Sequence, residues 1–208
     1  MNAYPNISAR SEEMARPRKA TANSSQLRII GGRWRSRKLV FNAAEGLRPT
    51  TDRSRETLFN WLAPYLHDAR CLDLFAGSGA LGLEALSRGA RHCDFVDSSA
   101  AVTRQISQHL ETLDALDLGV CHCMPATQFL KERGKSYDIV FVDPPFGKGL
   151  LESACAALEC DRFLSDEAWI YIEHAAQEAT PGLPDRWHLY RQKSTGGVNC
   201  ALYHIAPV

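Results

Sequence analysis

The order of apolar and polar residues predicts strands and helices in turn along most of the chain. Largely apolar runs at residues 70–75 and 137–143 are rich in β-branched and aromatic residues, as buried strands are. Between such runs the apolar residues fall at helical spacing, for example Val102, Ile106 and Leu110. This alternation predicts an α/β fold, with a doubly wound and mostly parallel sheet and right-handed crossovers. Further strands are predicted at residues 91–97, 119–123, 168–174, 187–193 and 198–205, and helices at about 52–66, 80–88, 100–110, 126–133 and 150–158.

The two ends of the chain depart from this alternation. The last two apolar runs flank the turn "STGG" at residues 194–197 and are expected to pair antiparallel. Residues 27–41 contain two short apolar runs around "GGRWRS", which predicts a hairpin. Residues 1–26 have no periodicity, so we expect a disordered tail there. The predicted parts are therefore this tail, a hairpin with one helix at 27–66, and the α/β domain at 67–208.

The formal net charge of zero conceals an uneven distribution. Residues 1–55 hold 12 Lys/Arg and 4 Asp/Glu, whereas residues 56–208 hold 12 and 20. A basic segment on an acidic body is typical of proteins with a polyanionic partner. Residues 28–38 combine five basic residues with apolar residues and Trp34, so this part is expected to be folded and basic, like a nucleic-acid contact surface. The side chains predicted to meet phosphates are those of Arg33, Arg35, Arg37 and Lys38.

Length and composition are those of an ordinary globular protein. A chain of 208 residues with 45% hydrophobic residues can bury a sizeable core. No apolar run approaches the ~20 residues of a membrane span, and the start of the chain lacks an apolar signal core. Seven cysteines form no CxxC pair, and most lie in apolar runs, where a reduced cysteine acts as a small hydrophobe. We therefore expect a cytoplasmic protein without a metal site.

A glycine-rich turn after the strand at residues 70–75 carries the first candidate chemistry. The segment "GSGALG", with Gly77, Gly79 and Gly82, matches the pattern G-x-G-x-x-G. The glycines allow a close backbone approach, and the start of the helix presents free N–H groups. Asp97 ends the next strand, where a carboxylate can accept hydrogen bonds from both hydroxyls of a ribose. Taken alone, this pattern fits NAD as well as S-adenosylmethionine (SAM).

Asp73 separates these two ligands. It lies four residues before Gly77, at the end of the strand, and is expected to face the ligand. A carboxylate at this place attracts a cation such as the ammonium group of SAM, whereas it repels the pyrophosphate of NAD. The sequence therefore favours SAM as the cofactor.

The segment "DPPF" at residues 143–146 carries the second candidate chemistry. Proline disfavours the helical region for the residue before it, so Asp143 is held extended at the end of a strand. Pro144 and Pro145 have a fixed φ and no N–H, while their carbonyls remain acceptors. A flipped base can donate both hydrogens of its amino group to such acceptors and stack on Phe146. Asp143 is predicted to stabilise the positive charge that develops on the amino nitrogen as it accepts a methyl group.

Four segments carry a family resemblance, in the same order along the chain: "RIIGGRWRSRKL", "GLRPTTDRSRETLFNWL", "CLDLFAGSGALGLEALSRGA" and "DIVFVDPPFGKGLL". From about Gln26 to the C-terminus, the chain resembles the RsmD family of bacterial 16S ribosomal RNA guanine-N2 methyltransferases. The resemblance implies a Rossmann-like class I SAM-dependent methyltransferase fold with a seven-stranded sheet and a small N-terminal hairpin. It also implies a monomer that methylates one guanine in the small ribosomal subunit or its assembly intermediate.

The resemblance assigns roles by position. This chain differs from the usual family pattern at two positions. It has Asp97 where Glu is common, and Pro125 where an Asp or Asn commonly contacts the adenine of SAM. Because proline has no N–H, we expect the backbone near Ala126 or the side chain of Met124 to take over that contact. The implied cofactor residues are Asp73, Phe75, Ala76, Gly77, Gly79, Asp97, Ser98, Ala126 and Thr50; the base site is Asp143, Pro144, Pro145 and Phe146; and Arg48, Arg53 and Lys148 join the hairpin residues as RNA contacts.

Three other functions stay open at this point. A DPP segment followed by an aromatic residue also serves adenine-N6 methylation, although 208 residues leave little room for a separate target-recognition domain. An NAD-dependent oxidoreductase fits the glycines but not Asp73 or the DPPF segment. A non-catalytic RNA-binding assembly factor accounts for the basic hairpin but not for Asp143.

Overall fold

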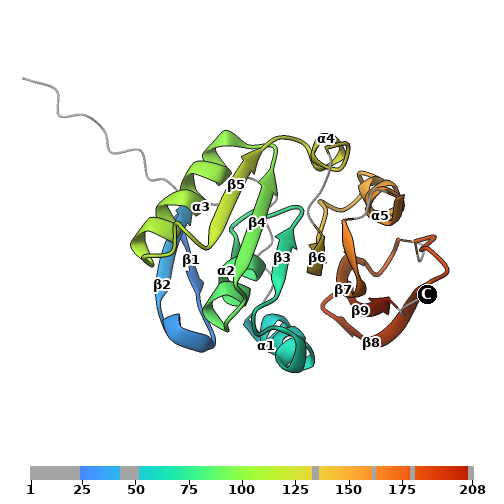
Figure 1. The fold of residues 1–208 in the computed structure, drawn as a ribbon, viewed down its shortest axis with the longest axis horizontal. Helices are drawn as coiled ribbons and strands as arrows, with labels where there is room; N and C mark the ends of the chain where they lie inside the picture. Colours follow the sequence, from blue (N-terminus) through green and yellow to red (C-terminus); the bar gives the residue numbers. More distant parts are fainter. Residues whose placement is uncertain (1–23, 43–51, 133–135, 161–162, 179–180, 206–208) are drawn as a thin grey trace, which may run out of the picture.

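The structure, a computed structural model, describes residues 24–42, 52–132, 136–160, 163–178 and 181–205. Its centre is a seven-stranded sheet in the order β5-β4-β3-β6-β7-β9-β8 (Figure 1). The strands from β5 to β7 in this order are parallel, and β9 pairs antiparallel with both β7 and β8. The predicted sheet with its antiparallel C-terminal pair is thus confirmed. The strands are β3 (Arg70–Asp73), β4 (His92–Asp97), β5 (Gly119–Cys123), β6 (Tyr137–Val142), β7 (Leu164–Ala175), β8 (Trp187–Thr195) and β9 (Val198–Ile205).

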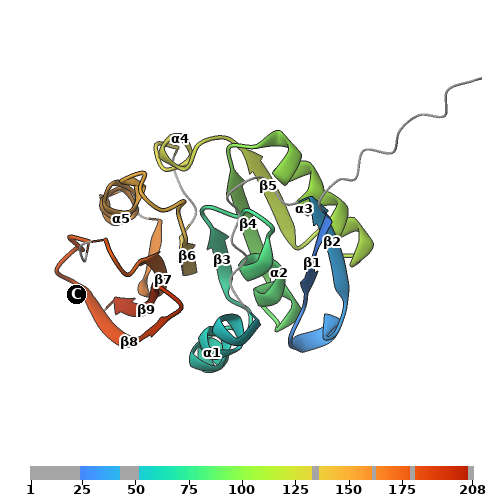
Figure 2. The same ribbon diagram turned by 180° about the vertical axis from the view of Figure 1, so that it is seen from behind.

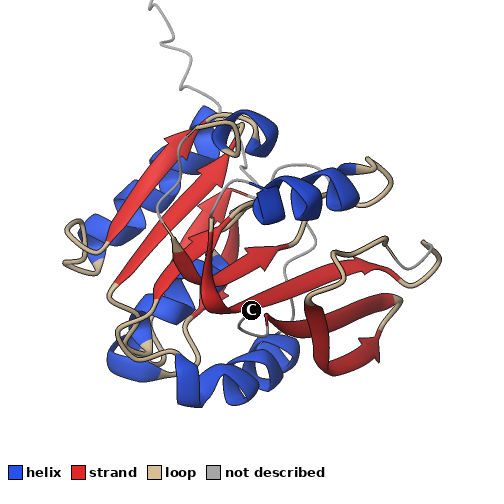
Figure 3. Ribbon diagram, turned by 45° about the vertical axis from the view of Figure 1, so that its right-hand side comes forward, coloured by secondary structure: helices blue, strands red, loops and turns tan. Residues whose placement is uncertain are grey.

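Helices cover both faces of the sheet (Figures 1, 2 and 3). Helices α1, α2 and α3 bury apolar residues against one face, and α4 and α5 bury theirs against the other. Alternate residues of each strand supply the two cores: Phe141 and Tyr171 belong to the first, whereas Val140 and Ile172 belong to the second. The helices are α1 (Asp52–Leu62), α2 (Ala80–Ser87), α3 (Ala100–Thr112), α4 (Ala126–Phe129) and α5 (Leu150–Cys160).

Two helices are shorter than the sequence predicted. Helix α1 ends at Leu62, and the chain continues in the 3-10 helix η2 (Ala63–Tyr65). Pro64 accounts for this change, because its missing N–H removes a hydrogen bond that a continuing α-helix would need. Helix α4 covers only the first four residues of the predicted 126–133. Within the described ranges, no helix is long and apolar enough to cross a membrane.

The N-terminal strands form the predicted hairpin, which is a sheet of its own. Strand β1 (Ser24–Arg28) pairs antiparallel with β2 (Lys38–Asn42), and the 3-10 turn η1 (Gly32–Trp34) lies between them. Strand β1 begins inside the segment 1–26 that was predicted to be disordered, and that boundary was wrong. Its first polar residues pair with β2 through the backbone, which needs no apolar pattern. Residues 1–23 lie outside the described part of the chain.

Glu84 fastens this hairpin to α2. Its fully buried carboxylate accepts a hydrogen bond from the Gly31 N–H at 2.8 Å and pairs with Arg88 at 2.7 Å. The Ser87 hydroxyl donates to the Gly31 carbonyl at 2.6 Å and accepts from the Trp34 N–H at 3.0 Å. All these contacts involve the C-terminal half of α2. The turn of the hairpin is therefore held at the end of the helix that lies opposite the glycine turn.

Candidate active site at the carboxyl edge of the sheet

The candidate residues gather where the strand order changes direction. From β3 the chain continues to β4 on one side, whereas β6 joins β3 on the other side. In open α/β sheets, ligands bind outside the carboxyl ends of the strands at such a switch point. Asp73 ends β3, Asp97 ends β4, and Asp143 directly follows β6. The sheet topology thus brings together the three acids that the sequence singled out.

The glycine turn between β3 and α2 has a backbone that suits close approach of a ligand. Gly77 and Gly79 have φ angles of 52° and 75°, in the left-handed region that favours glycine. A Cβ at Gly82 would lie 2.2 Å from the Phe95 ring, so this third glycine lets α2 pack directly on β4. Asp97 accepts a hydrogen bond from the Gly77 N–H at 3.1 Å, which ties the turn to the end of β4.

Asp73 lies beneath this turn and is only 2% exposed. Its carboxylate accepts a hydrogen bond from the Gly82 N–H at 3.0 Å. Burial raises the pKa of Asp73 to about 7; the hydrogen bond from Gly82 opposes this shift, and the charge of Asp97 adds to it. Asp73 takes part in none of the ion pairs between described residues. A cationic group of a ligand would therefore be stabilised beside it.

The DPPF loop presents an aromatic ring next to a fixed backbone. Pro144 is buried, whereas Pro145 is exposed and Phe146 is 40% exposed. Gly147, with a φ of 71°, turns the chain directly after the ring, and its N–H donates to Glu178 Oε1 at 2.6 Å. The loop is thus tied to the segment that follows β7, and the Phe146 side chain is partly open to solvent.

Asp143 stands beside two other acids. Burial raises the pKa of the Asp143 carboxyl well above its ordinary value, and the charges of Glu173 and Asp73 raise it further. Like Asp73, it takes part in none of the ion pairs between described residues. A group that donates hydrogen bonds or develops positive charge is therefore favoured at this corner.

Glu173, on β7, belongs to the same group of acids, and the sequence reasoning missed it. It is 5% exposed, and its Oε1 accepts a hydrogen bond from the Tyr171 hydroxyl at 2.6 Å. A signal was present in the sequence, because the run "IYIE" ends on an acid just as "CLD", "DFVD" and "IVFVD" do. Acids at the ends of four strands of one parallel sheet meet at one edge.

The other predicted cofactor residues lie around this edge where the structure describes them. The Ala76 N–H donates to the Val96 carbonyl at 2.9 Å, which holds the glycine turn beside β4. The Met124 N–H donates to the Asp97 carbonyl at 3.0 Å, and Ala126 then begins α4 and is 8% exposed. Of the remaining residues, Phe75 is partly buried, Ser98 is exposed, and Thr50 lies outside the described residues.

The predicted RNA contacts do not lie together. Lys148 is exposed beside the DPPF loop, and Arg53 is exposed on the first turn of α1. The hairpin turn, by contrast, is held at the far end of α2, which has eight residues and is therefore about 12 Å long. Arg33, Arg35, Arg37 and Lys38 are all exposed there or nearby on the hairpin, and Arg48 lies outside the described residues.

Known proteins resemble this chain over most of its length. A family model described as conserved hypothetical protein 95 matches residues 27–204. The protein of Escherichia coli strain K12 called ribosomal RNA small subunit methyltransferase D is 51% identical over 182 residues, which are 88% of this chain and 91% of that protein. A protein of the same name from Haemophilus influenzae is 43% identical over 182 residues, which are 86% of this chain and 93% of that protein.

The solved structures agree with these sequence matches. A structure from Escherichia coli, described as that of a methyltransferase, has a TM-score of 0.81 and 47% identity, and it covers 88% of this chain and 100% of its own. The predicted methyltransferase fold is thereby confirmed. The chain belongs to the conserved hypothetical protein 95 family, which is the RsmD family that its four sequence segments resemble.

Proposed function

We propose that this protein transfers a methyl group from SAM to the exocyclic N2 of one guanine in 16S ribosomal RNA, within the small subunit or its assembly intermediate. The relatives that cover most of this chain are called methyltransferases of small-subunit ribosomal RNA. The observation that carries the proposal is the position of Asp143. Its carboxyl group lies at the switch point of the sheet, with Asp73 close enough to raise its pKa. The acid that would hold the acceptor thus adjoins the place where the cofactor would bind.

The residues at this edge fit SAM on three observations. Asp73 is a buried carboxylate for which the ammonium group of SAM is a suitable counter-charge. Gly77 and Gly79 hold the backbone open at the start of α2, where a side chain at either place would strain the turn. Asp97 already accepts hydrogen bonds from two backbone N–H groups, and a carboxylate has about four acceptor positions, so it can also accept from a ribose.

Bound SAM supplies an electrophilic methyl group on a sulfonium, and the reaction leaves S-adenosylhomocysteine, N2-methylguanine and a proton. The amino nitrogen of guanine is a poor nucleophile because its lone pair is conjugated with the ring. The Asp143 carboxylate and the Pro144 carbonyl accept hydrogen bonds from the two hydrogens of the amino group. These bonds orient the nitrogen and favour a pyramidal shape. As positive charge develops there, the Asp143 carboxylate stabilises it. Phe146 stacks on the base, and the proton leaves to water.

The hairpin extends the proposed contact with RNA away from the reacting atoms. Its exposed basic side chains lie at the far end of α2, so they would bind phosphates at a distance from the target base. Such contacts give affinity without choosing a base. The separation between the basic hairpin and the base site agrees with a folded ribosomal particle as substrate rather than a short single strand.

The decisive experiment identifies the product. The protein is incubated with methyl-labelled SAM and small-subunit particles from a strain that lacks the activity, and the RNA is digested to nucleosides. We expect the label in N2-methylguanosine at a single site, and none with the Asp143→Ala variant. Label in N6-methyladenosine would replace the proposal by an adenine-specific reaction, and particle binding without label would replace it by a non-catalytic assembly role.

A further inference from the structure

Asp143, directly after β6, and Glu173, on the adjacent strand β7, occupy neighbouring places. Strands β6 and β7 are parallel, with Phe141 opposite Tyr171. Two residues further along the chain from this pair lie Asp143, just beyond the end of β6, and Glu173, on β7. Adjacent strands are about 4.8 Å apart. Because side chains two residues apart share a face of a strand, the Glu173 carboxyl group lies on the face of Tyr171, and Asp143 continues the alternation of β6 from Phe141. The charge of Glu173 acts on Asp143, as expected of close neighbours. The rings of Phe141 and Tyr171 are in contact, with centroids 6.5 Å apart.

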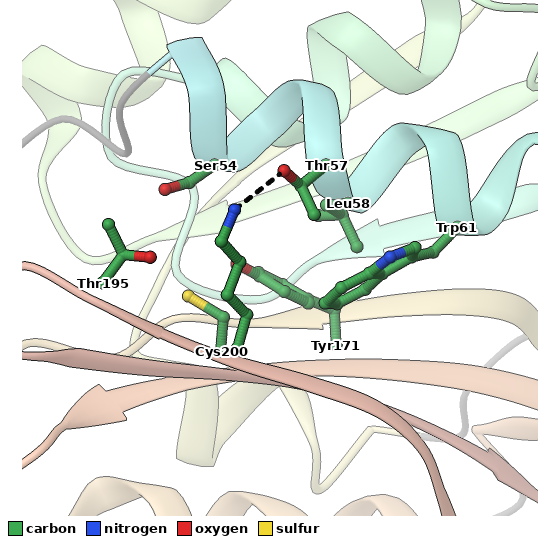
Figure 4. A pocket seen from close by; sticks show the side chains of 8 residues that line it. Ser54, Thr57, Leu58, Trp61, Tyr171, Thr195 and Cys200 are labelled. Carbon is green, nitrogen blue, oxygen red and sulfur yellow. Dashed lines mark hydrogen bonds between the residues drawn. The ribbon is translucent and has the colours of Figure 1, made fainter.

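Glu173 is held by polar neighbours on that face. The Tyr171 hydroxyl donates to its Oε1 at 2.6 Å, and β9 places Cys200 opposite it. Tyr171 and Cys200 also line a small cavity beneath α1, together with Thr57 (Figure 4). Lys193, from β8, closes the cavity by donating to Thr57 Oγ1 at 3.5 Å. The surroundings of Tyr171 and Glu173 on this face therefore consist of side chains from strands and a helix, not from a loop.

Two adjacent carboxyl groups match the Watson–Crick edge of guanine. Beside its amino group guanine carries a second donor, N1–H, whereas adenine and cytosine carry a ring nitrogen with a lone pair beside theirs. A carboxylate next to this position accepts a hydrogen bond from guanine but repels the lone pair of the other two bases. A site built for a donor discriminates strongly against a ligand that lacks it, because its own polar group is then left unpaired.

We propose that Glu173 selects guanine by accepting a hydrogen bond from N1–H, while Asp143 and the Pro144 carbonyl hold the N2 amino group. This inference rests on the proposed function, because it assigns a role in the same base site. Tyr171 is a positioning residue, since its hydroxyl orients the Glu173 carboxylate and acts on the base only through it. Burial is the largest cause of the raised pKa of Asp143, and the charge of Glu173 is the second largest. This agrees with the closeness of the two groups.

The test replaces the target guanine in reconstituted small-subunit particles by 2,6-diaminopurine. This base keeps the amino group at C2 but has a lone pair at N1. With labelled SAM, we expect the wild-type protein to prefer the guanine particle by about 100-fold in kcat/KM, a typical cost of an unpaired buried acceptor. The Glu173→Gln variant, whose amide can donate to N1, should narrow this preference by at least about tenfold.

Two further variants separate a specificity role from a structural one. Tyr171→Phe should narrow the preference in the same direction but by a smaller factor, because Glu173 remains with a less fixed orientation. Glu111→Gln, the same substitution at an exposed position on α3, should leave both rates unchanged.

Each outcome decides the inference. Equal wild-type rates on the two particles would overturn it, and so would an unchanged preference in a folded Glu173→Gln variant that binds SAM. If that variant does not fold, the wild-type comparison and the Tyr171→Phe variant still decide. Failure of the proposed function looks different, because the wild-type protein would then leave the guanine particle without N2-methylguanosine, and the inference would fall with it.

Discussion

Buried acids occur in two kinds of surroundings in this molecule, and they differ in the charges beside them. Glu84 is fully buried but pairs with Arg88 at 2.7 Å and lies 3.9 Å from Arg55. Asp94, on β4, accepts hydrogen bonds from His122 at 2.7 Å and from the Tyr137 hydroxyl at 2.9 Å. Burial would raise the pKa of Asp94, but the His92 ring at 3.3 Å and the hydrogen bonds from His122 and Tyr137 outweigh it, so this pKa lies below its ordinary range.

Asp73, which is buried, and Asp143, which is partly buried, are in the opposite situation. Burial raises the pKa of both groups, and the neighbouring charges that act on them are also negative. A buried acid that has positive or hydrogen-bond-donating partners holds parts of the fold together, as Glu84 holds the hairpin to α2. An acid that is buried among other acids costs stability, and such groups are concentrated at functional sites. On this contrast, Glu84 and Asp94 stabilise the fold, whereas Asp73 and Asp143 are the candidates for contact with a ligand.

The largest expected effect comes from Asp143. Replacing it by alanine should lower kcat for methyl transfer by about 1000-fold, because a fixed group that stabilises developing charge is worth this order of rate. SAM binding should stay within about threefold of the wild-type value, since Asp143 is assigned to the base and not to the cofactor. Single-turnover rates with small-subunit particles and calorimetric titration with SAM measure the two quantities. A variant with full turnover would remove Asp143 from the mechanism.

Replacing Glu84 should lower the free energy of unfolding, because this buried acid has positive partners. Glu84→Gln leaves Arg88 without its buried counter-charge and removes the more distant partner of Arg55, which keeps Asp52 at 2.6 Å. Breaking one partner of a buried pair costs about 3 kcal/mol or more. Urea unfolding at pH 7 measures the loss, with Glu56→Gln on the exposed side of α1 as the matched control. A loss no larger than that of the control would mean that Glu84 does not hold the hairpin in place.

Removing the charge of Asp73 should have the opposite effect and raise the free energy of unfolding of the ligand-free protein. In the unfolded chain its carboxyl ionises near 3.8, whereas in the folded protein its pKa is about 7. The folded state thus binds the extra proton between these values, so the contribution of Asp73 to the free energy of unfolding falls as pH rises from about 4 to about 7. Asp73→Asn removes this dependence and should stabilise the ligand-free protein by about 2 kcal/mol at pH 8, given ~1.4 kcal/mol per unit of pKa and partial relaxation.

The same variant should bind SAM about tenfold more weakly, because it no longer offers a negative charge to the ammonium group. Affinity of the wild-type protein should also rise as pH increases through about 7, where Asp73 loses its proton, and this dependence should be absent in the variant. Unfolding curves at pH 5 and pH 8 and titrations with SAM across this range test both statements. A variant that is less stable at both pH values would place Asp73 with the structural acids.

The sequence predicted one of these two kinds of acid much better than the other. Asp73, Asp97 and Asp143 each end an apolar run, and the rule that parallel strands share a carboxyl edge brings them together without further information. Glu84 gave no such signal, because its partner Gly31 is 53 residues away in the sequence and the contact depends on how the hairpin packs on α2. Local patterns predict elements and strand ends, whereas contacts between elements come from tertiary packing.

The smallest expected effect concerns the basic side chains, which divide in the same way as the acids. Arg55 and Arg88 lie 3.9 Å and 2.7 Å from the buried carboxylate of Glu84, whereas Arg33, Arg35 and Lys38 are exposed. Replacing the three exposed residues by alanine should weaken particle binding and reduce the slope of log affinity against log salt by about 2, since each lost phosphate contact removes most of one counterion.

The matched control replaces Arg91, Arg104 and Lys131, which are equally exposed but lie outside the hairpin. It should alter the slope by less than half as much. Because the hairpin turn lies one length of α2 from the glycine turn, the hairpin variant should raise KM while kcat stays near its wild-type value. Equal slopes for the two variants would show that the affinity for RNA arises from overall charge and not from the hairpin, and the separation of the molecule into a binding end and a reacting edge would then be wrong.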